Sequence, residues 1–215
     1  MNSVGDGFAW PFRDPAWPGK MLVQGLIAII PIVGWIAMTG WLMLAFENAR
    51  SGKNELPPAG FHLERGIAIF GVFLIYGIVL SIPAIILWTA GAIASGQSHS
   101  PFNAGSPLIS LAYLLSTAAS LFFRFLCPSL IVNTYHGGFS GGMDVMRVWR
   151  LAVANVGNSV IAGLVILVAS FIGGIGFACC IGFIFTIPYE NVITAAAAAW
   201  FEKQQAAPAP AAPGA

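Results

Sequence analysis

Charged residues are scarce in this sequence. Only 8% of its 215 residues are Asp, Glu, Lys or Arg, against about 25% in a typical soluble domain. Three long stretches contain no charge at all, namely Met21–Phe46, Gly66–Phe123 and Leu151–Tyr189. The mean hydropathy is correspondingly high, at +0.83. This pattern excludes an ordinary water-exposed surface and predicts helices that are solvated by lipid.

An excess of positive charge is also missing. The formal net charge is +1, which excludes the basic face that a nucleic-acid partner requires. The few cysteines all lie in apolar runs and are expected to be buried as small hydrophobic residues: Cys127, Cys179 and Cys180. The histidines are scattered and show no H-E-x-x-H spacing: His62, His99 and His136. We therefore expect neither a metal nor a cofactor.

The lengths of the uncharged stretches predict how often the chain crosses the bilayer. One crossing takes about 20 apolar residues, so 21–46 fits a single helix, bent at Pro31 and Gly34. The stretch 66–123 has 58 residues, and 151–201 would be about 77 Å long as one helix, more than twice the roughly 30 Å hydrocarbon core. Each must fold back, with turns at 96–107 and Gly173–Gly174. We expect an all-α polytopic transmembrane bundle of about five crossings.

The remaining segments flank this single transmembrane domain, residues 21–203. Residues 1–20 combine prolines, aromatics and a few charges, which is typical of a lead-in that lies at the membrane interface. The segment 143–154 places apolar residues on one side at helical spacing and predicts a short interfacial helix. Residues 204–215 are rich in Ala and Pro and predict a disordered tail.

The placement of Lys and Arg predicts orientation. Five crossings put 47–65, 136–150 and the C-terminus on one side, and this side holds most of the basic residues. By the positive-inside rule that side is cytoplasmic, in an inner membrane. Arg13 and Lys20 disagree, because this topology places the N-terminus outside. The alternative is four crossings plus a re-entrant hairpin that breaks at Pro31 and returns the chain to the same side.

Two charges fall inside predicted crossings. Arg124 and Glu190 lie about 15 and 18 Å from the cytoplasmic ends of their helices, and a lone charge at such depth is costly. We predict that they pair across the bundle. Neighbouring polar residues at helical spacing complete the predicted polar centre: Ser120, Thr186, Asn191 and Thr194. The pair either binds an ion, proton or head group, or only fixes the helix register.

Two further segments are candidate functional sites. The polar loop 47–65 is either a solvated turn or a docking loop, with Arg50, Lys53, Phe61 and Arg65 as its contact residues. The run Gly138–Gly142 (GFSGG) matches G-x-S-x-G and resembles the G-x-S-G of rhomboid proteases. No His follows His136 to act as the base that Ser140 would need, so we expect a flexible glycine connector and no catalytic site.

The N-terminal third resembles a known family. The residues that carry the likeness are Pro11-Phe12, Asp14, Trp17, Gly25, Ile30-Pro31, Gly40-Trp41, Asn48, Gly52 and Leu56-Pro57. This pattern, clearest over 8–80, resembles the bacterial and archaeal membrane family called domain of unknown function 4013. The resemblance implies a small multi-helix membrane protein and supplies no activity, substrate or cofactor.

Together these features predict a non-catalytic integral membrane protein. Its expected role is to organise or support a membrane process, in contact with the lipid bilayer and with other membrane-protein subunits as further partners. The alternative function is a small transporter or channel for an ion or a lipid that uses Arg124 and Glu190.

Overall fold

The computed structural model describes residues 3–96, 105–178 and 182–206. Over these ranges every regular element is a helix, which confirms the predicted all-α class. The elements are α1 (Asp6–Ala9), η1 (Trp10–Arg13), α2 (Trp17–Ala28), α3 (Val33–Arg50), α4 (Leu63–Gly96), α5 (Gly105–Met143), α6 (Val145–Ala154), α7 (Val156–Ala178) and α8 (Phe183–Ala206).

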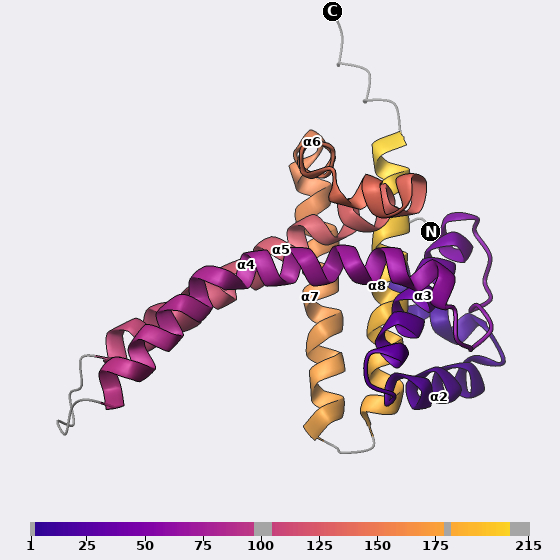
Figure 1. The fold of residues 1–215 in the computed structure, drawn as a ribbon. Helices are drawn as coiled ribbons and strands as arrows, with labels where there is room; N and C mark the ends of the chain where they lie inside the picture. Colours follow the sequence, from indigo (N-terminus) through magenta and orange to yellow (C-terminus); the bar gives the residue numbers. More distant parts are fainter. Residues whose placement is uncertain (1–2, 97–104, 179–181, 207–215) are drawn as a thin grey trace, which may run out of the picture.

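The molecule consists of a helical body and one long projecting hairpin (Figure 1). Helices α7 and α8 lie side by side in the body, and the N-terminal helices pack beside α8. Helices α4 and α5 pair along their length and extend well beyond the body. Three of the described helices are long and apolar enough to cross a membrane, at Leu63–Gly96, Pro107–Met143 and Val156–Gly176. This is consistent with a membrane protein and does not confirm five crossings.

The first uncharged stretch forms two helices, whereas its length and composition predict one bent helix. Helix α2 ends at Ala28 and α3 begins at Val33. Between them the chain makes a γ-turn of the positive-φ type, with Ile32 at φ 63 and ψ −61 and the Val33 N–H donating to the Pro31 carbonyl at 2.7 Å. The two helices contact each other and form a hairpin. The chain segments at its open end also meet, since the Trp10 indole, before α2, donates to the Lys53 carbonyl, after α3, at 2.9 Å.

Helix α8 forms the centre of the body. All residues from Val192 to Phe201 are buried, including the five alanines of 195–199. Such small side chains let neighbouring helices approach closely, and α8 packs against α2, α3, α5 and α7. Gly25 of α2 marks one contact, since a Cβ there would lie 1.8 Å from the Ile184 carbonyl oxygen.

Two predicted turns are helical in the structure. The prediction of a turn at Gly173–Gly174 is wrong, because α7 continues to Ala178. The glycine connector 137–142 is also helical, and it interrupts α5 only at Gly138, where φ is 61. A non-glycine residue rarely adopts this backbone conformation, so the sequence permits the kink there.

The predicted short helix at 143–154 is present as α6. The Asp144 carboxylate caps it by accepting from the Arg147 N–H at 3.0 Å. Val148 and Ala152 are buried, whereas Val145 and Trp149 are exposed. Residues 204–206 of the predicted tail continue α8, and 207–215 lie outside the described residues, as do His99, Cys179 and Cys180.

Candidate functional site

The predicted polar centre lies where α5, α7 and α8 meet. Arg124 is at the middle of α5, and its Nη1 donates to the Ser170 hydroxyl and, at 3.4 Å, to the Ile166 carbonyl, both on α7. The Ser170 hydroxyl in turn donates to Glu190 Oε1 on α8 at 2.5 Å. Arg124 and Glu190 are therefore brought together through Ser170, and no direct ion pair joins them in the described residues.

Ser170 is the residue that sequence reasoning missed. Between Ser159 and Ala178 it is the only residue with a polar side chain. A single polar residue in such an apolar run is itself an indication, since a polar side chain buried among membrane helices needs a partner on another helix. A search of the uncharged stretches for single polar residues would have found it.

Close packing of α7 on α8 brings Glu190 to this position. A Cβ at Gly173 would lie 2.2 Å from Glu190 Oε2, and one at Gly176 would lie 1.9 Å from Thr186 Oγ1. Thr186 also donates to the Gly173 carbonyl at 3.1 Å. Gly173, predicted to lie in a turn, and Gly176 therefore contact the polar side chains of α8 directly.

A cavity of about 330 Å³ opens beside the three linked residues. Aromatic side chains line part of its wall, including Trp35, Phe73 and Phe123. The polar residues that line it are Ser120, Arg124, Ser170, Glu190, Asn191 and Thr194. Five of the six predicted polar-centre residues thus share one cavity, and Thr186 lies one helical turn before Glu190.

Several polar groups of this cavity have hydrogen-bonding capacity left. Arg124 Nε is buried and has no partner in the described structure, and Nη1 is the only guanidinium nitrogen with one. The Asn191 amide nitrogen donates to the Ile187 carbonyl at 3.0 Å, which leaves the amide oxygen for another donor. Because a guanidinium carries five N–H groups, the site can donate several hydrogen bonds to a bound acceptor.

The residues of the predicted docking loop contact several different parts of the molecule. Arg50 pairs with Glu202 of α8 at 2.7 Å and lies 5.5 Å from the centre of the Tyr135 ring. His136 binds the other oxygen of Glu202 at 2.6 Å. The Arg65 guanidinium pairs with Glu47, the Lys53 backbone carbonyl accepts from Trp10, and Phe61 remains 55% exposed.

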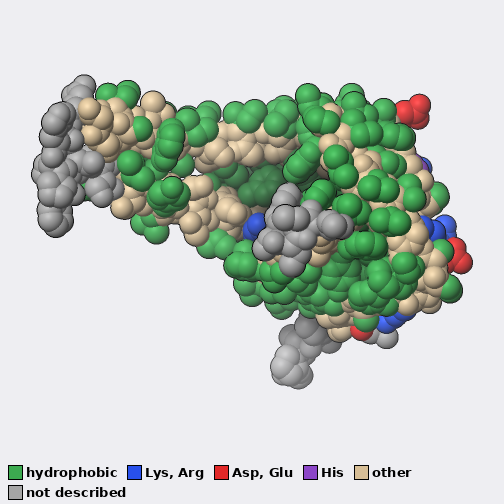
Figure 2. All heavy atoms as spheres, turned by 90° about the horizontal axis from the view of Figure 1, so that it is seen from below, with side chains coloured by type: hydrophobic (Ala, Val, Ile, Leu, Met, Phe, Trp, Pro, Cys, Tyr) green, Lys and Arg blue, Asp and Glu red, His purple; other side chains and the backbone are tan. Residues whose placement is uncertain are grey.

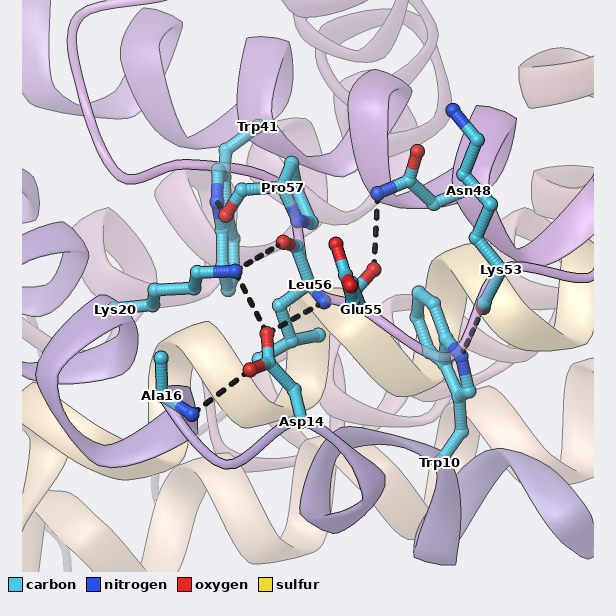
Figure 3. A network of polar contacts seen from close by, with 10 residues as sticks. All are labelled: Trp10, Asp14, Ala16, Lys20, Trp41, Asn48, Lys53, Glu55, Leu56 and Pro57. Carbon is cyan, nitrogen blue, oxygen red and sulfur yellow. Dashed lines mark hydrogen bonds and ion pairs between the residues drawn. The ribbon is translucent and has the colours of Figure 1, made fainter.

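The same loop is fastened to the N-terminal lead-in by a carboxylate. Asp14 is only 3% exposed, and it accepts from the Leu56 N–H at 2.8 Å, from the Ala16 N–H at 2.8 Å and from Lys20 Nζ at 2.7 Å (Figure 3). Lys20 also donates to the Leu56 carbonyl at 2.6 Å. Burial by itself raises the pKa of Asp14, but these hydrogen bonds outweigh it and hold the pKa below its usual value of 3.8.

Neighbouring contacts extend this clasp, which comprises Asp14, Lys20 and Leu56. The Trp41 indole donates to the Pro57 carbonyl at 3.3 Å, and the Asn48 amide donates to the Glu55 carbonyl at 2.9 Å (Figure 3). Asp14, Trp41, Asn48, Leu56 and Pro57 are all residues that carry the family resemblance. They are thus explained as parts of one structural joint.

Ser140 has no catalytic partner in the described residues. Its hydroxyl donates to the Gly137 carbonyl at 3.0 Å. His136, one turn earlier, binds Glu202, and His62 contacts the Pro58 carbonyl at 2.8 Å. The Ser140 hydroxyl therefore binds the backbone next to the kink in α5.

Comparisons with known proteins agree with the family resemblance. Residues 23–185 match the family described as "Protein of unknown function (DUF4013)". No curated protein and no solved structure matches the chain. The match spans most of the sequence and includes the second half of α2, all of α3, and the polar-centre residues Arg124 and Ser170. The chain belongs to the DUF4013 family.

Proposed function

We propose that this chain is a non-catalytic multi-pass membrane protein that organises or supports a membrane process as an accessory component. The observation that best supports this proposal is the projecting α4–α5 hairpin. Its outward side chains are apolar and exposed, for example Ile86 at 61% and Leu114 at 65%. Lipid can cover such a surface, and so can the helices of another membrane protein or of a second copy.

Photo-crosslinking tests the accessory role. Leu114→p-benzoylphenylalanine on the hairpin is expected to give a protein adduct of one defined mass in native membranes. A second copy would double the chain's 22.6 kDa, and another subunit would add its own mass. Phe171→p-benzoylphenylalanine on α7, where the side chain is equally exposed at 67%, serves as the matched control and should react only with lipid. Lipid adducts alone at both positions would contradict the accessory role.

The topology that goes with this proposal has four crossings, formed by α4, α5, α7 and α8, with α2 and α3 as a re-entrant hairpin. Helix α2 has 12 residues and is about 18 Å long, too short to span. The contact of Trp10 with Lys53 supports placing the N-terminus beside the 47–65 loop. Eight of the nine Lys and Arg residues, all but Arg124, then lie on one side, which the positive-inside rule makes cytoplasmic.

Cysteine labelling distinguishes four crossings from five. In a variant without native cysteines, Ser3→Cys and Ser51→Cys are both expected to be protected from an impermeant maleimide in intact cells. Gly96→Cys, at the far end of α4, should be labelled. The three residues are exposed in the structure. Labelling of Ser3→Cys but not of Ser51→Cys would instead require a crossing between them and would favour five.

The second candidate function is a small transporter or channel for a lipid or an ion. The specific observation in its favour is the cavity at the polar centre, whose lining combines Arg124 and Glu190 with hydroxyl groups and apolar side chains. Ionisable groups inside a membrane bundle commonly mark such pathways. Helix α8 also contains Pro188 close to Glu190, and interrupted helices are frequent at transporter binding sites.

A further inference from the structure

A line of polar residues runs from the polar centre along the α5 helix. Ser116, Ser120 and Arg124 recur every four residues and therefore lie along one side of α5. Ser116 and Ser120 are exposed, and neither hydroxyl has a hydrogen-bond partner in the described structure. Thr117, also exposed, instead satisfies its hydroxyl by donating to the Tyr113 carbonyl at 2.9 Å.

This line connects two cavities. Ser120 and Arg124 line the cavity at the polar centre, and Ser116 lines a second one, of about 310 Å³, between α4 and α5. Figure 2 shows that the molecule is hollowed where the hairpin leaves the body, with hydrophobic side chains in and around the hollow and a Lys or Arg side chain at its edge. A ligand for this place must therefore combine apolar chains with a polar group.

The charges of the site define that polar group. Arg124 supplies a cation with unused N–H groups. Glu190 supplies a carboxylate that accepts from Ser170 through Oε1 and does not use Oε2 in that bond. A simple anion would be attracted by Arg124 but repelled by Glu190, and a simple cation would meet the reverse. A zwitterion can satisfy both charges at once.

We propose that the polar centre binds the head group of a phospholipid of the phosphoethanolamine class. The phosphate oxygens accept from the free N–H groups of Arg124 and from the Ser120 hydroxyl, because charge-assisted bonds to guanidinium are strong. The ammonium group donates to the Glu190 carboxylate and to the Asn191 amide oxygen. The acyl chains lie in the hollow, against the apolar side chains of the hairpin.

The depth of the site suits a lipid that enters from one leaflet. Ser170 is eight residues from the end of α7, and Glu190 is seven residues from the start of α8. At 1.5 Å per residue the centre lies about 11 Å from these helix ends, nearer to them than to the charged side of the molecule. The head group thus reaches the site from the leaflet opposite the 47–65 loop.

This inference deepens the second candidate function and rests on it only for the choice of site, since binding does not require transport. Lipid retention tests the binding. The full-length protein, delipidated in detergent, is offered equal amounts of phosphatidylethanolamine, phosphatidylglycerol and diacylglycerol. Retained lipid is then measured by mass spectrometry after gel filtration. The wild type should retain phosphatidylethanolamine about tenfold better than the other two, a difference of about 1.4 kcal/mol.

Three variants make this test specific to the site. Ser120→Leu fills the cavity and should cut phosphatidylethanolamine retention about tenfold, whereas Thr117→Leu, on the same helix but outside the cavity lining, should not. Glu190→Gln removes the anion but can keep the Ser170 bond, so it should shift the preference to phosphatidylglycerol. Equal retention of all three lipids by the wild type, or no effect of Ser120→Leu, would overturn the proposal even if Glu190→Gln failed to fold.

Reconstitution separates binding from transport. Vesicles that contain the protein and a fluorescent phosphatidylethanolamine report movement between leaflets as accessibility to dithionite. Movement above that of protein-free vesicles would support both the bound lipid and the second candidate function. Selective retention without movement would support the binding site and remove lipid transport as the function.

Discussion

Replacing Asp14 with alanine is expected to lower the free energy of unfolding by about 3–5 kcal/mol, because it breaks a buried ion pair and leaves one partner uncompensated. The Asp14 carboxylate is 3% exposed and accepts from Lys20 and from two backbone N–H groups. In the variant, Lys20 keeps only the Leu56 carbonyl as a partner. Denaturation of the purified protein in mild detergent, followed by near-ultraviolet circular dichroism, measures the loss.

A neighbouring variant controls for the loss of charge. Glu55→Ala removes the same charge one residue from Leu56, but its side chain is exposed, so a change within about 0.5 kcal/mol is expected. The pH dependence gives a second control. Since the pKa of Asp14 is lowered by folding, its stabilisation is fully present above 3.8 and is lost as the pH falls through the folded-state value. The difference between Asp14→Ala and wild type should therefore shrink in acid, and an acid-independent difference would contradict this assignment.

The contacts of the clasp also show why the sequence leaves two topologies open for residues 21–46, one crossing or a re-entrant hairpin. Uncharged stretches identify lipid-solvated segments, because hydrocarbon excludes unpaired charges. They do not tell whether a 26-residue stretch crosses once or turns back. Pro31 indicated a break, but the deciding contacts join Asp14 to Leu56 and Trp10 to Lys53, which are about 40 residues apart. Such pairings depend on tertiary packing and leave no local periodicity in the sequence.

The sequence predicts the positions of Arg124 and Glu190 along their helices, but it does not predict the contacts that link them. Counting residues along two helices placed Arg124 and Glu190 at similar depths, and the structure does place them on one cavity. The rotation of α7 decides that Ser170 lies between them, and a charge pattern contains no information about that helix. The same rotation sets Gly173 against Glu190. A glycine pair in an apolar run fits a turn and a close helix contact equally well, so the predicted turn at 173–174 was placed too early.

Removing one charge of the polar centre should destabilise the protein strongly, whereas removing both should not. Arg124→Leu leaves Glu190 without its nearby cation, and Glu190→Leu leaves the guanidinium with only neutral partners. Each single variant is expected to lose about 3–5 kcal/mol of unfolding free energy in detergent, while the double variant stays within about 1 kcal/mol of wild type or exceeds it. Arg150→Leu, at an exposed site on α6, controls for loss of a cation. Additive losses in the double variant would show that the two groups are not coupled.

The double variant also separates the two roles that these opposite charges, linked through Ser170, can have. If Arg124 and Glu190 only fix the register of α5, α7 and α8, a stable charge-free variant should be indistinguishable from wild type in every other respect, including the lipids it retains. If they form a binding site, the variant should be stable and yet retain phosphatidylethanolamine no better than diacylglycerol. Leucine restores the packing but supplies neither the N–H donors nor the carboxylate. A stable double variant with unchanged lipid selectivity would therefore assign the pair to structure alone.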